Sequence, residues 1–511
     1  MDLLIREFVL EEVRDSMKYV DPKQYDFSRL NEEQLKVAVK DDAIFDTKFE
    51  TKPVGYLKDA AIRFAKNKGS LVAGIVLMIL VTFAIFGPLM SPWQTDQTQD
   101  FYRLCLPKVH EASNGFWDGT EMKTEPEKTF IYDNSRGAVV GEAKKGKVSE
   151  GVQYYTYRCD TYIKGYIFKD FSEEEYNAVL DYQNKTGKQV LFPLLDTSYN
   201  IDPYTGMPKS MGIEYQHQDA NNYYQIDKSF NPILDAEGKI IPIYEVDGEG
   251  KYVLYHFNGA NYEVRINYDA YYIMLNGKAP MYYFGSDGMG RDIFTRLWHG
   301  ARLSLLLGVG VSLINIILGV IYGAIEGYYG GKADLIMERI SDILVEIPSL
   351  ILLTLFQIYF ASKWGPVPAL LLAFVLTGWI GTASRVRMQF YRFKNQEYVL
   401  AARVLGAKDR RIIFRHILPN AIGTLITSVI LMIPGVIFSE STLSFLNIID
   451  LETGTMTSIG TMLAAGQDLL DTHPHVLLFP AIFISILMIS FNLFGNGLRD
   501  AFNPSLRGVE E

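Results

Sequence analysis

The residues whose types and spacing could do chemistry lie in the basic segment 385–420, and that chemistry is protein binding rather than catalysis. The segment holds nine Lys+Arg and two acids. Small side chains at Ala401 and Ala402 would let another surface approach closely, and Gly406 would permit a bend. Pro419 is expected to stop the helix that begins before them. The candidate docking residues are Glu397, Ala401, Ala402, Arg403, Gly406, Ala407, Leu418 and Pro419.

Nucleotide and metal chemistry have little support in the sequence. A P-loop needs Gly-x-x-x-x-Gly-Lys followed by Ser or Thr. The run Gly-Gly-Lys-Ala at 330–333 lacks both the upstream glycine and the hydroxyl. His473 and His475 lack the nearby cysteines or paired carboxylates that are typical of a zinc site. We therefore expect no catalytic residue, cofactor or metal in this chain.

Long apolar runs position the basic segment. Because 48% of the 511 residues are hydrophobic and gather in uncharged runs, the chain suits a bilayer better than a water-soluble core. A spanning segment needs about 20 apolar residues, and it must be helical because lipid cannot satisfy free backbone groups. The sequence predicts an all-α polytopic core with six transmembrane helices, at 71–90, 303–325, 347–362, 367–384, 421–439 and 476–498.

Basic residues beside these runs predict the orientation, since cytoplasmic connections are enriched in Lys and Arg. Three clusters fall on one side if there are six spans: Lys58, Arg63, Lys66 and Lys68, then the segment 385–420, then Arg499 and Arg507. Both termini should then be cytoplasmic. The predicted order is a cytoplasmic segment 1–69, a first helix 70–91, an external domain 92–284, and a five-helix core 285–508 with a cytoplasmic coupling loop 385–420.

The external segment is long enough to fold as a domain. Residues 91–284 hold 28 Asp+Glu against 19 Lys+Arg, so nucleic acid is an unsuitable partner. They also hold 23 of the 32 tyrosines, which suit either a contact surface or ordinary strands. We predict a β-rich α+β domain with a helix near 172–182. In an oxidising exterior, Cys105 and Cys159 could form a disulfide.

The basic segment resembles the EAA loop of bacterial ABC importer permeases. That loop reads Glu-Ala-Ala-x-x-x-Gly, then nine residues and Ile-x-Leu-Pro. The matching positions here are Ala401, Ala402, Gly406, Leu418 and Pro419. The chain departs from the pattern at Leu400 and His416, and in this it is similar to the peptide/nickel subgroup of the family.

Further segments resemble the C-type subunit of the same subgroup, namely 285–292, 440–446 and 492–500. The resemblance covers about half of the chain and leaves out 1–52 and the external domain. It implies a type I ABC importer permease fold in the cytoplasmic membrane of a bacterium. It also implies a B-type permease partner, two ATPase subunits that hold the ATP and Mg, and an extracellular substrate-binding protein that delivers a peptide. The same machinery importing nickel or another small solute stays open.

Two carboxylates beside the spans have two interpretations each. A charge at membrane depth costs at least roughly a few kcal/mol, so Glu346 and Glu440 should face protein or water. They could line a water-filled pathway that meets the amino terminus of a peptide, or they could lie at the interface and cap helices. The family resemblance suggests a structural role for Glu440 at the external gate. Pro434 and Gly435 are expected to kink their helix.

Two other classes of protein fit the sequence less well. A peptide-sensing receptor would use 91–284 as its sensor, but the expected cytoplasmic segments would be too short for a kinase or cyclase. An intramembrane enzyme would need a nucleophile or metal ligands within the spans, and none is evident. Co-purification of an ATPase pair would separate the importer from both.

Overall fold

The computed structural model describes residues 56–109, 117–149, 151–196 and 232–502. Predictions that concern 1–55 and 503–508 lie outside the described residues. Within 422–427, side chains are described only for Leu425.

The membrane core is made of long apolar helices. Five helices among the described residues are long and apolar enough to cross a membrane, and a sixth span results if the pair α8 and α9, bent by 75°, counts as one. The helices of the core are α3 (Lys68–Phe86), α7 (Ile293–Tyr329), α8 (Gly331–Val345), α9 (Ser349–Trp364), α10 (Pro366–Gly378), α11 (Ile380–Phe393), α14 (Leu418–Phe445) and α16 (His475–Phe502). The short helices α2 (Tyr56–Lys66) and α15 (Ile459–Gln467) complete it.

The third predicted span differs most from the structure. Helix α9 has only 16 residues, and α8 precedes it across a sharp bend at Glu346 to Pro348. Helix α8 carries charged residues such as Asp334 and Glu338, so its apolar content was too low for it to be recognised as part of a span. Its charges instead face other helices of the core, as described below.

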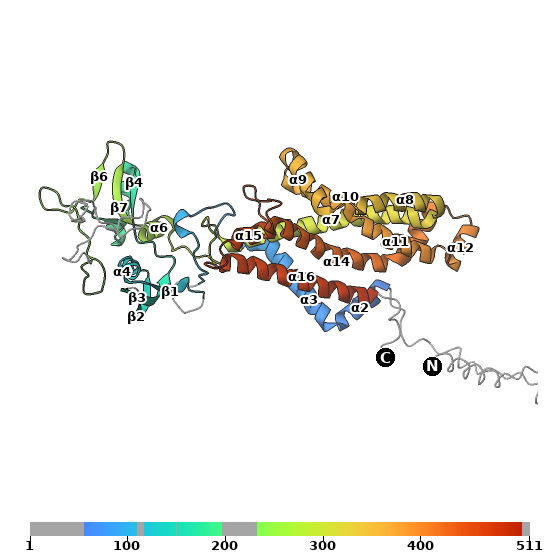
Figure 1. Ribbon diagram of the computed structural model, residues 1–511, viewed down its shortest axis with the longest axis horizontal. Helices are drawn as coiled ribbons and strands as arrows, with labels where there is room; N and C mark the ends of the chain where they lie inside the picture. The colour runs from blue at the N-terminus through green and yellow to red at the C-terminus, as the bar shows by residue number, and fades with distance from the viewer. Residues whose placement is uncertain (1–55, 110–116, 150, 197–231, 503–511) are drawn as a thin grey trace, which may run out of the picture. The chain divides into compact units, whose positions relative to one another are not determined.

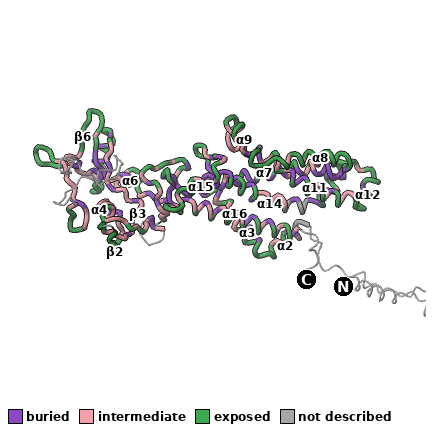
Figure 2. The backbone as a smooth tube through the Cα atoms, viewed as in Figure 1, coloured by how far each residue is buried: buried purple, intermediate pink, exposed green. Residues whose placement is uncertain are grey.

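Helix α7 lies at the centre of the core, and glycines let α11 approach it closely. Gly319, Gly323 and Gly327 follow one another at intervals of one helical turn. A Cβ added at Gly323 would lie 2.2 Å from the carbonyl oxygen of Ala383 in α11. Small residues at such spacing are a common way of packing helices in membranes. Figure 2 shows the buried backbone concentrated where α7 and α11 run together.

The inserted segment between α3 and α7 contains two small antiparallel sheets (Figure 1). The first has strand order β1 (Thr120–Pro126), β3 (Val152–Asp160) and β2 (Val139–Ser149), with α4 (Glu127–Ser135) packed on β3. The second has β7 (Tyr262–Asn267) between β4 (Tyr166–Phe171) and β5 (Leu191–Phe192), and β6 (Tyr255–Phe257) also pairs with β7.

Two helices cover one face of the second sheet. Helix α5 (Glu173–Thr186) begins with a capping box at Ser172 and ends at Gly187, and α6 (Tyr268–Asn276) follows β7 directly. Val179 and Tyr271 of these helices pack on the buried side chains of the sheet. The two sheets support the predicted β-rich α+β character in part, and the predicted helix near 172–182 is present as α5.

Many tyrosines of the inserted segment are core residues. The buried ones are Tyr102, Tyr157, Tyr162, Tyr176, Tyr271, Tyr272 and Tyr282. Tyr102, Tyr162, Tyr272 and Tyr282 pack together with Cys105 in one cluster. Aromatic rings supply large buried area in a small domain, so the packing role accounts for this part of the tyrosine content.

Ion pairs and backbone contacts fasten the inserted segment to the start of α7. The backbone N–H of Leu104 donates to the carbonyl oxygen of Asp287 (3.1 Å). The hydroxyl of Ser286 donates to the backbone carbonyl oxygen of Tyr102 (2.5 Å). The Asp287 carboxylate accepts the backbone N–H of Arg291 and also pairs with its guanidinium (2.8 Å). The root of the inserted segment is therefore held tightly.

The same ion-pair network reaches the loop after α14. Arg291 also pairs with Glu452, and Arg296 of α7 lies 3.2 Å from that carboxylate. The two guanidinium groups hold the pKa of Glu452 below its ordinary value, against the opposing effect of burial. Three segments that are distant in sequence are thus joined at this point.

The predicted disulfide is wrong. Cys105 and Cys159 are both free and buried. Cys105 packs among tyrosines beside Ser286, whereas Cys159 lies in β3 against Ala138 and Tyr157. Each thiol fills its own apolar cluster, which is the usual place of a free cysteine.

The environment of the two thiols predicts slow alkylation of the native protein. Burial raises the pKa of Cys159 to about 11 and also raises that of Cys105, so both remain protonated at neutral pH, and only the thiolate is nucleophilic. A maleimide reagent should label neither in the folded protein and both after unfolding without reductant. Two thiols that stay unreactive in the unfolded, unreduced protein would instead indicate a bridge.

Candidate functional site

The segment singled out by sequence forms a short helix held on the core by one buried face. Helix α12 (Glu397–Val404) buries Val399 and Ala402, which are 0% and 9% exposed. Val399 joins a buried cluster with Tyr328 of α7 and Phe390 of α11. Burying one valine side chain contributes about 1.5–3 kcal/mol. The two alanines differ in position, because Ala402 is buried and Ala401 is exposed.

Gly406 ends α12 through its backbone conformation. Its φ is +82°, and the N–H groups of Gly406 and Ala407 donate to the carbonyl oxygens of Arg403 and Ala402 (both 3.0 Å). This is the Schellman arrangement, in which a left-handed residue closes the helix. Nothing lies within 4 Å of a Cβ added at Gly406. The predicted bend is present, and it depends on conformation rather than on a lack of space.

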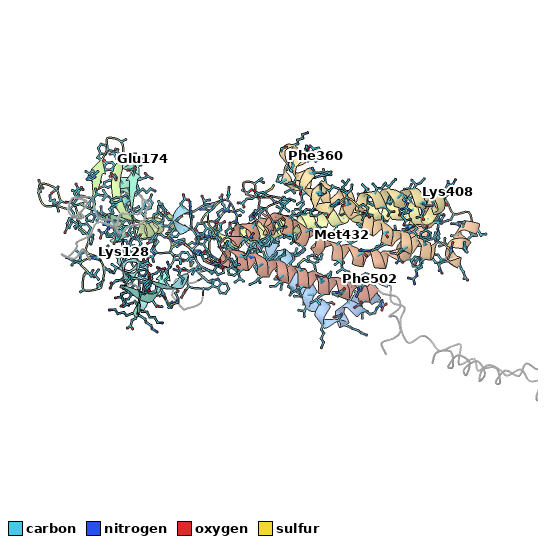
Figure 3. All side chains as sticks on the ribbon, viewed as in Figure 1. Lys128, Glu174, Phe360, Lys408, Met432 and Phe502 are labelled. Carbon is cyan, nitrogen blue, oxygen red and sulfur yellow. The ribbon has the colours of Figure 1, made fainter. Side chains whose placement is uncertain are left out.

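Polar contacts fix both ends of α12. The Tyr328 hydroxyl donates to the Asp409 carboxylate (2.6 Å), and the Arg403 guanidinium lies 3.5 Å from the same hydroxyl. On the other side, the amide of Asn420 donates to the hydroxyl of Tyr398 (3.3 Å). Glu397 is exposed in the first turn, where an acid favours the helix dipole. Figure 3 labels Lys408, which follows the turn at the end of α12.

Pro419 does not stop a helix, and the prediction on this point is wrong. Residues Asp409–Arg411 form α13, a π-helix follows over Ile412–Ile417, and α14 begins at Leu418. Pro419 lies in the first turn of α14, where its missing N–H matters least. The π-helix has i→i+5 hydrogen bonds. It ends just before Pro419, a residue that would break the i→i+4 hydrogen bonds of a continuous α-helix. Leu418 is half-buried against the α12 cluster.

A second polar cluster, shared by α7, α8 and α11, was not predicted from the sequence. Arg387 of α11 makes a two-pronged contact with Asp334 of α8 (2.6 and 3.0 Å) and another with Glu338 (2.8 and 3.0 Å). Glu326 of α7 lies 3.6 Å from the same guanidinium. Three helices thus share one cation. The signal that could have revealed it is the spacing of Asp334 and Glu338, which places both acids on one face of a helix.

The outward edge of α12 is apolar, and no other part of the described chain packs against it. Val404 and Leu405 are each 87% exposed, and Leu400 and Ala401 are exposed beside them. Charged or polar residues usually occupy such positions on a soluble surface. The arrangement is a small, firmly held apolar ridge, which can bind a complementary groove of another protein.

The predicted pathway residues lie in two different places. Glu346 is exposed at the bend between α8 and α9, on the wall of a cavity of about 630 Å³ that Arg387 and Glu338 also line. Glu440 is only 1% exposed, and its carboxylate accepts hydrogen bonds from Ser304 (2.9 Å) and Ser444 (3.3 Å). Glu440 is therefore closed off from solvent within this chain. It binds α14 to α7 through hydroxyl groups.

The proline and glycine of α14 do not interrupt it. Pro434 is buried inside the helix, Gly435 is exposed, and a Cβ added at Gly435 would meet no atom within 4 Å. Met432, labelled in Figure 3, marks this stretch of α14. No metal-binding group of three or more His, Cys, Asp or Glu occurs in the part of the chain that the structure describes.

Comparison with known proteins places the chain in a family. The family described as "Binding-protein-dependent transport system inner membrane component" matches residues 278–508, and the "N-terminal TM domain of oligopeptide transport permease C" matches 55–107. The oligopeptide transport system permease protein OppC of Bacillus subtilis is 43% identical over 237 residues, which is 46% of this chain and 76% of that protein. The chain belongs to this family of transport permeases.

Other relatives of this permease agree. The dipeptide transport system permease protein DppC of Bacillus subtilis is 44% identical, over 44% of this chain and 69% of that protein. The glutathione transport system permease protein GsiD of Pectobacterium atrosepticum is 33% identical, over 47% and 78%. A structure titled "Inward facing conformations of the MetNI methionine ABC transporter: CY5 native crystal form" aligns at 15% identity and TM-score 0.35, over 41% of this permease and 96% of that chain. Residues 108–277 lie outside both family matches.

The conformation of Gly406 predicts a specific pattern of substitutions. A left-handed backbone costs an ordinary residue about 1–2 kcal/mol, and asparagine tolerates it better. Gly406→Val should loosen the end of α12 and abolish transport, whereas Gly406→Asn should retain most of it. Transport and membrane abundance would be measured together.

The matched control is Gly381→Ala in α11, where open space surrounds a helical glycine. It should leave transport unchanged, because alanine favours a helix by about 0.5–1 kcal/mol over glycine. Normal transport by Gly406→Val would contradict the role given to this residue.

Proposed function

We infer that this permease is the C-type subunit of an ATP-driven importer that moves oligopeptides across the cytoplasmic membrane. It would form half of the translocation pore with a B-type permease. Two ATPase subunits would hydrolyse ATP beneath it, with Mg bound in those partners, and an extracellular substrate-binding protein would deliver the peptide. The chain itself would be no enzyme.

The proposal depends on one observation, which is that α12 has a buried face and an exposed apolar edge. One face of the helix is buried on α7, α11 and the π-helix, while Val404 and Leu405 project outward. A partner that closes against this ridge would push on three core elements at once, because α12 is fastened to all of them. Such a contact could convert a partner's closure into a shift between two states of the pore.

The relatives favour a peptide over nickel or another small solute as the substrate. Their printed names refer to oligopeptides, dipeptides and glutathione, all of which contain peptide bonds. Uptake of a peptide as the sole source of an essential amino acid would test this choice. Growth on nickel-limited medium is the corresponding test of the alternative.

The positive charges support an orientation in which the end of the core that carries α12 is cytoplasmic. The hydroxyl of Ser70, near the start of α3, donates to the carbonyl oxygen of Leu493 (3.0 Å), so Lys68 and Arg499 lie toward the same end of the helix pair. The basic residues of α11 to α13 belong to the end that carries α12. Lys and Arg are enriched on the cytoplasmic side of membrane proteins. The end of the core that carries α12 would therefore be cytoplasmic, and the inserted segment would be extracellular.

A charge on the α12 ridge should uncouple the permease from its ATPases. Val404→Asp would place a carboxylate in an apolar contact, where a central residue typically contributes more than 1 kcal/mol. We expect the ATPase subunits to be lost on co-purification and peptide uptake to fall by about tenfold or more. The control is Val148→Asp on β2, which is also exposed; it should affect neither measurement.

The proposed orientation can be read from cysteine labelling in whole cells. Lys145→Cys on β2 and Lys408→Cys after α12 place exposed thiols at opposite ends, whereas the two native thiols are buried. A membrane-impermeant maleimide should label position 145 in intact cells and position 408 only after permeabilisation. The reverse pattern would overturn the assignment of sides.

A further inference from the structure

An open cavity of about 450 Å³ lies beside the second sheet of the inserted segment, away from the membrane core. Its walls come from β4, at residues 167–169, and from α6, which lies beside β4 and β7 in Figure 1. Phe101 and Gln99 close it on a third side. Its volume is in the range of small-ligand sites, and nothing in the function proposed above uses it.

One wall of the cavity is the unpaired edge of a strand. Strand β4 pairs with β7 along its full length, from Tyr166 opposite Asn267 to Phe171 opposite Tyr262. Among the described residues, no strand pairs with the other edge of β4, and no backbone group of 167–171 bonds to any main chain except that of β7. Such an edge presents a row of free N–H and C=O groups that another extended chain can pair with.

The opposite wall is aromatic and firmly packed. The Tyr271 ring of α6 packs on Phe171 at the end of β4, with 5.2 Å between ring centroids, and the centroids of Phe101 and Tyr268 are 4.2 Å apart. Leu275 is exposed at the rim, and the amide of Asn276 lies beside it. A strand edge and an aromatic helix that line the same open cavity suit an extended peptide. Its backbone would pair with the strand and its side chains would pack on the helix.

A lysine at the cavity lacks a carboxylate partner. The Lys169 ammonium lies 4.7 Å from the centre of the Tyr271 ring and 3.4 Å from the Tyr271 hydroxyl. Among the described residues, no carboxylate lies within 4 Å of it, whereas Lys108 and Lys123 of the same segment are each ion-paired. The cavity thus offers one positive charge without a carboxylate partner among the described residues, on a surface of apolar, tyrosine and amide side chains.

We propose that this cavity binds the carboxyl-terminal residues of a short peptide. The peptide adds to the free edge of β4 as a further antiparallel or parallel strand, and its terminal carboxylate pairs with Lys169. A free peptide fits better than a folded partner, because a stable protein interface covers a much larger area than this cavity offers. The proposal rests on the function proposed above only in taking that peptide to be the transported substrate.

The test is peptide binding to the purified full-length chain. A pentapeptide with an apolar carboxyl-terminal residue, labelled at its amino terminus, is titrated by fluorescence anisotropy as the free acid and as the carboxyl-terminal amide. The free acid should bind about tenfold more tightly or better, as expected for a hydrogen bond to a charged group. Lys169→Gln should remove this preference, and Lys145→Gln on β2 should keep it.

Backbone pairing has its own readout. Two peptides are compared, one N-methylated at its odd-numbered residues and the other at its even-numbered residues. Both keep their side chains and carboxylate, but each loses the backbone donors on one side. The peptide that loses the donors facing the strand edge should bind at least about tenfold more weakly. Equal binding of acid and amide, or of all methylated forms, would overturn the proposal even if cells import the peptide normally. Conversely, selective binding without any uptake would leave the cavity assignment standing and refute the importer.

Discussion

The burial of two side chains, Val399 and Ala402, is the interaction on which the rest of the candidate site depends. Those side chains set the rotation of α12 about its axis, and the rotation decides which residues face outward. The Tyr328 hydroxyl then fixes the turn after the helix through Asp409. Without the buried contact, the exposed ridge of Val404 and Leu405 would have no defined direction. A short helix of eight residues is not stable alone in water, so its order comes from this packing.

The same principle of shared attachment recurs elsewhere in the molecule. Arg387 joins α7, α8 and α11 through carboxylates, and Glu440 joins α7 and α14 through hydroxyl groups. At the root of the inserted segment, Arg291 and Arg296 connect it to the loop that holds Glu452. Breaking such a buried pair leaves an uncompensated charge, which is costly. The polar groups of this permease thus link helices and loops that are distant in sequence.

Sequence patterns predicted the long apolar helices, the end of α12 and the α+β insert, because each has a local signal. Uncharged runs are visible directly, and Gly406 sits where a helix needs a left-handed residue. Pro419 was misread because a proline is compatible with both the end and the first turn of a helix, and only the π-helix before it decides. The free thiols were misread because redox context says nothing about distance. Helix α8 was missed since its charges are satisfied by α11, a contact that no local pattern reveals.

The π-helix ahead of α14 has a geometric consequence. A π-turn holds one residue more than an α-turn, so its conversion to α-helical geometry would release a single residue. Everything beyond Ile417 would then turn by about 100° and advance by about 1.5 Å along the axis. Such a conversion at Ile412–Ile417 would therefore rotate α14 relative to the α12 ridge, because the π-helix lies between the two.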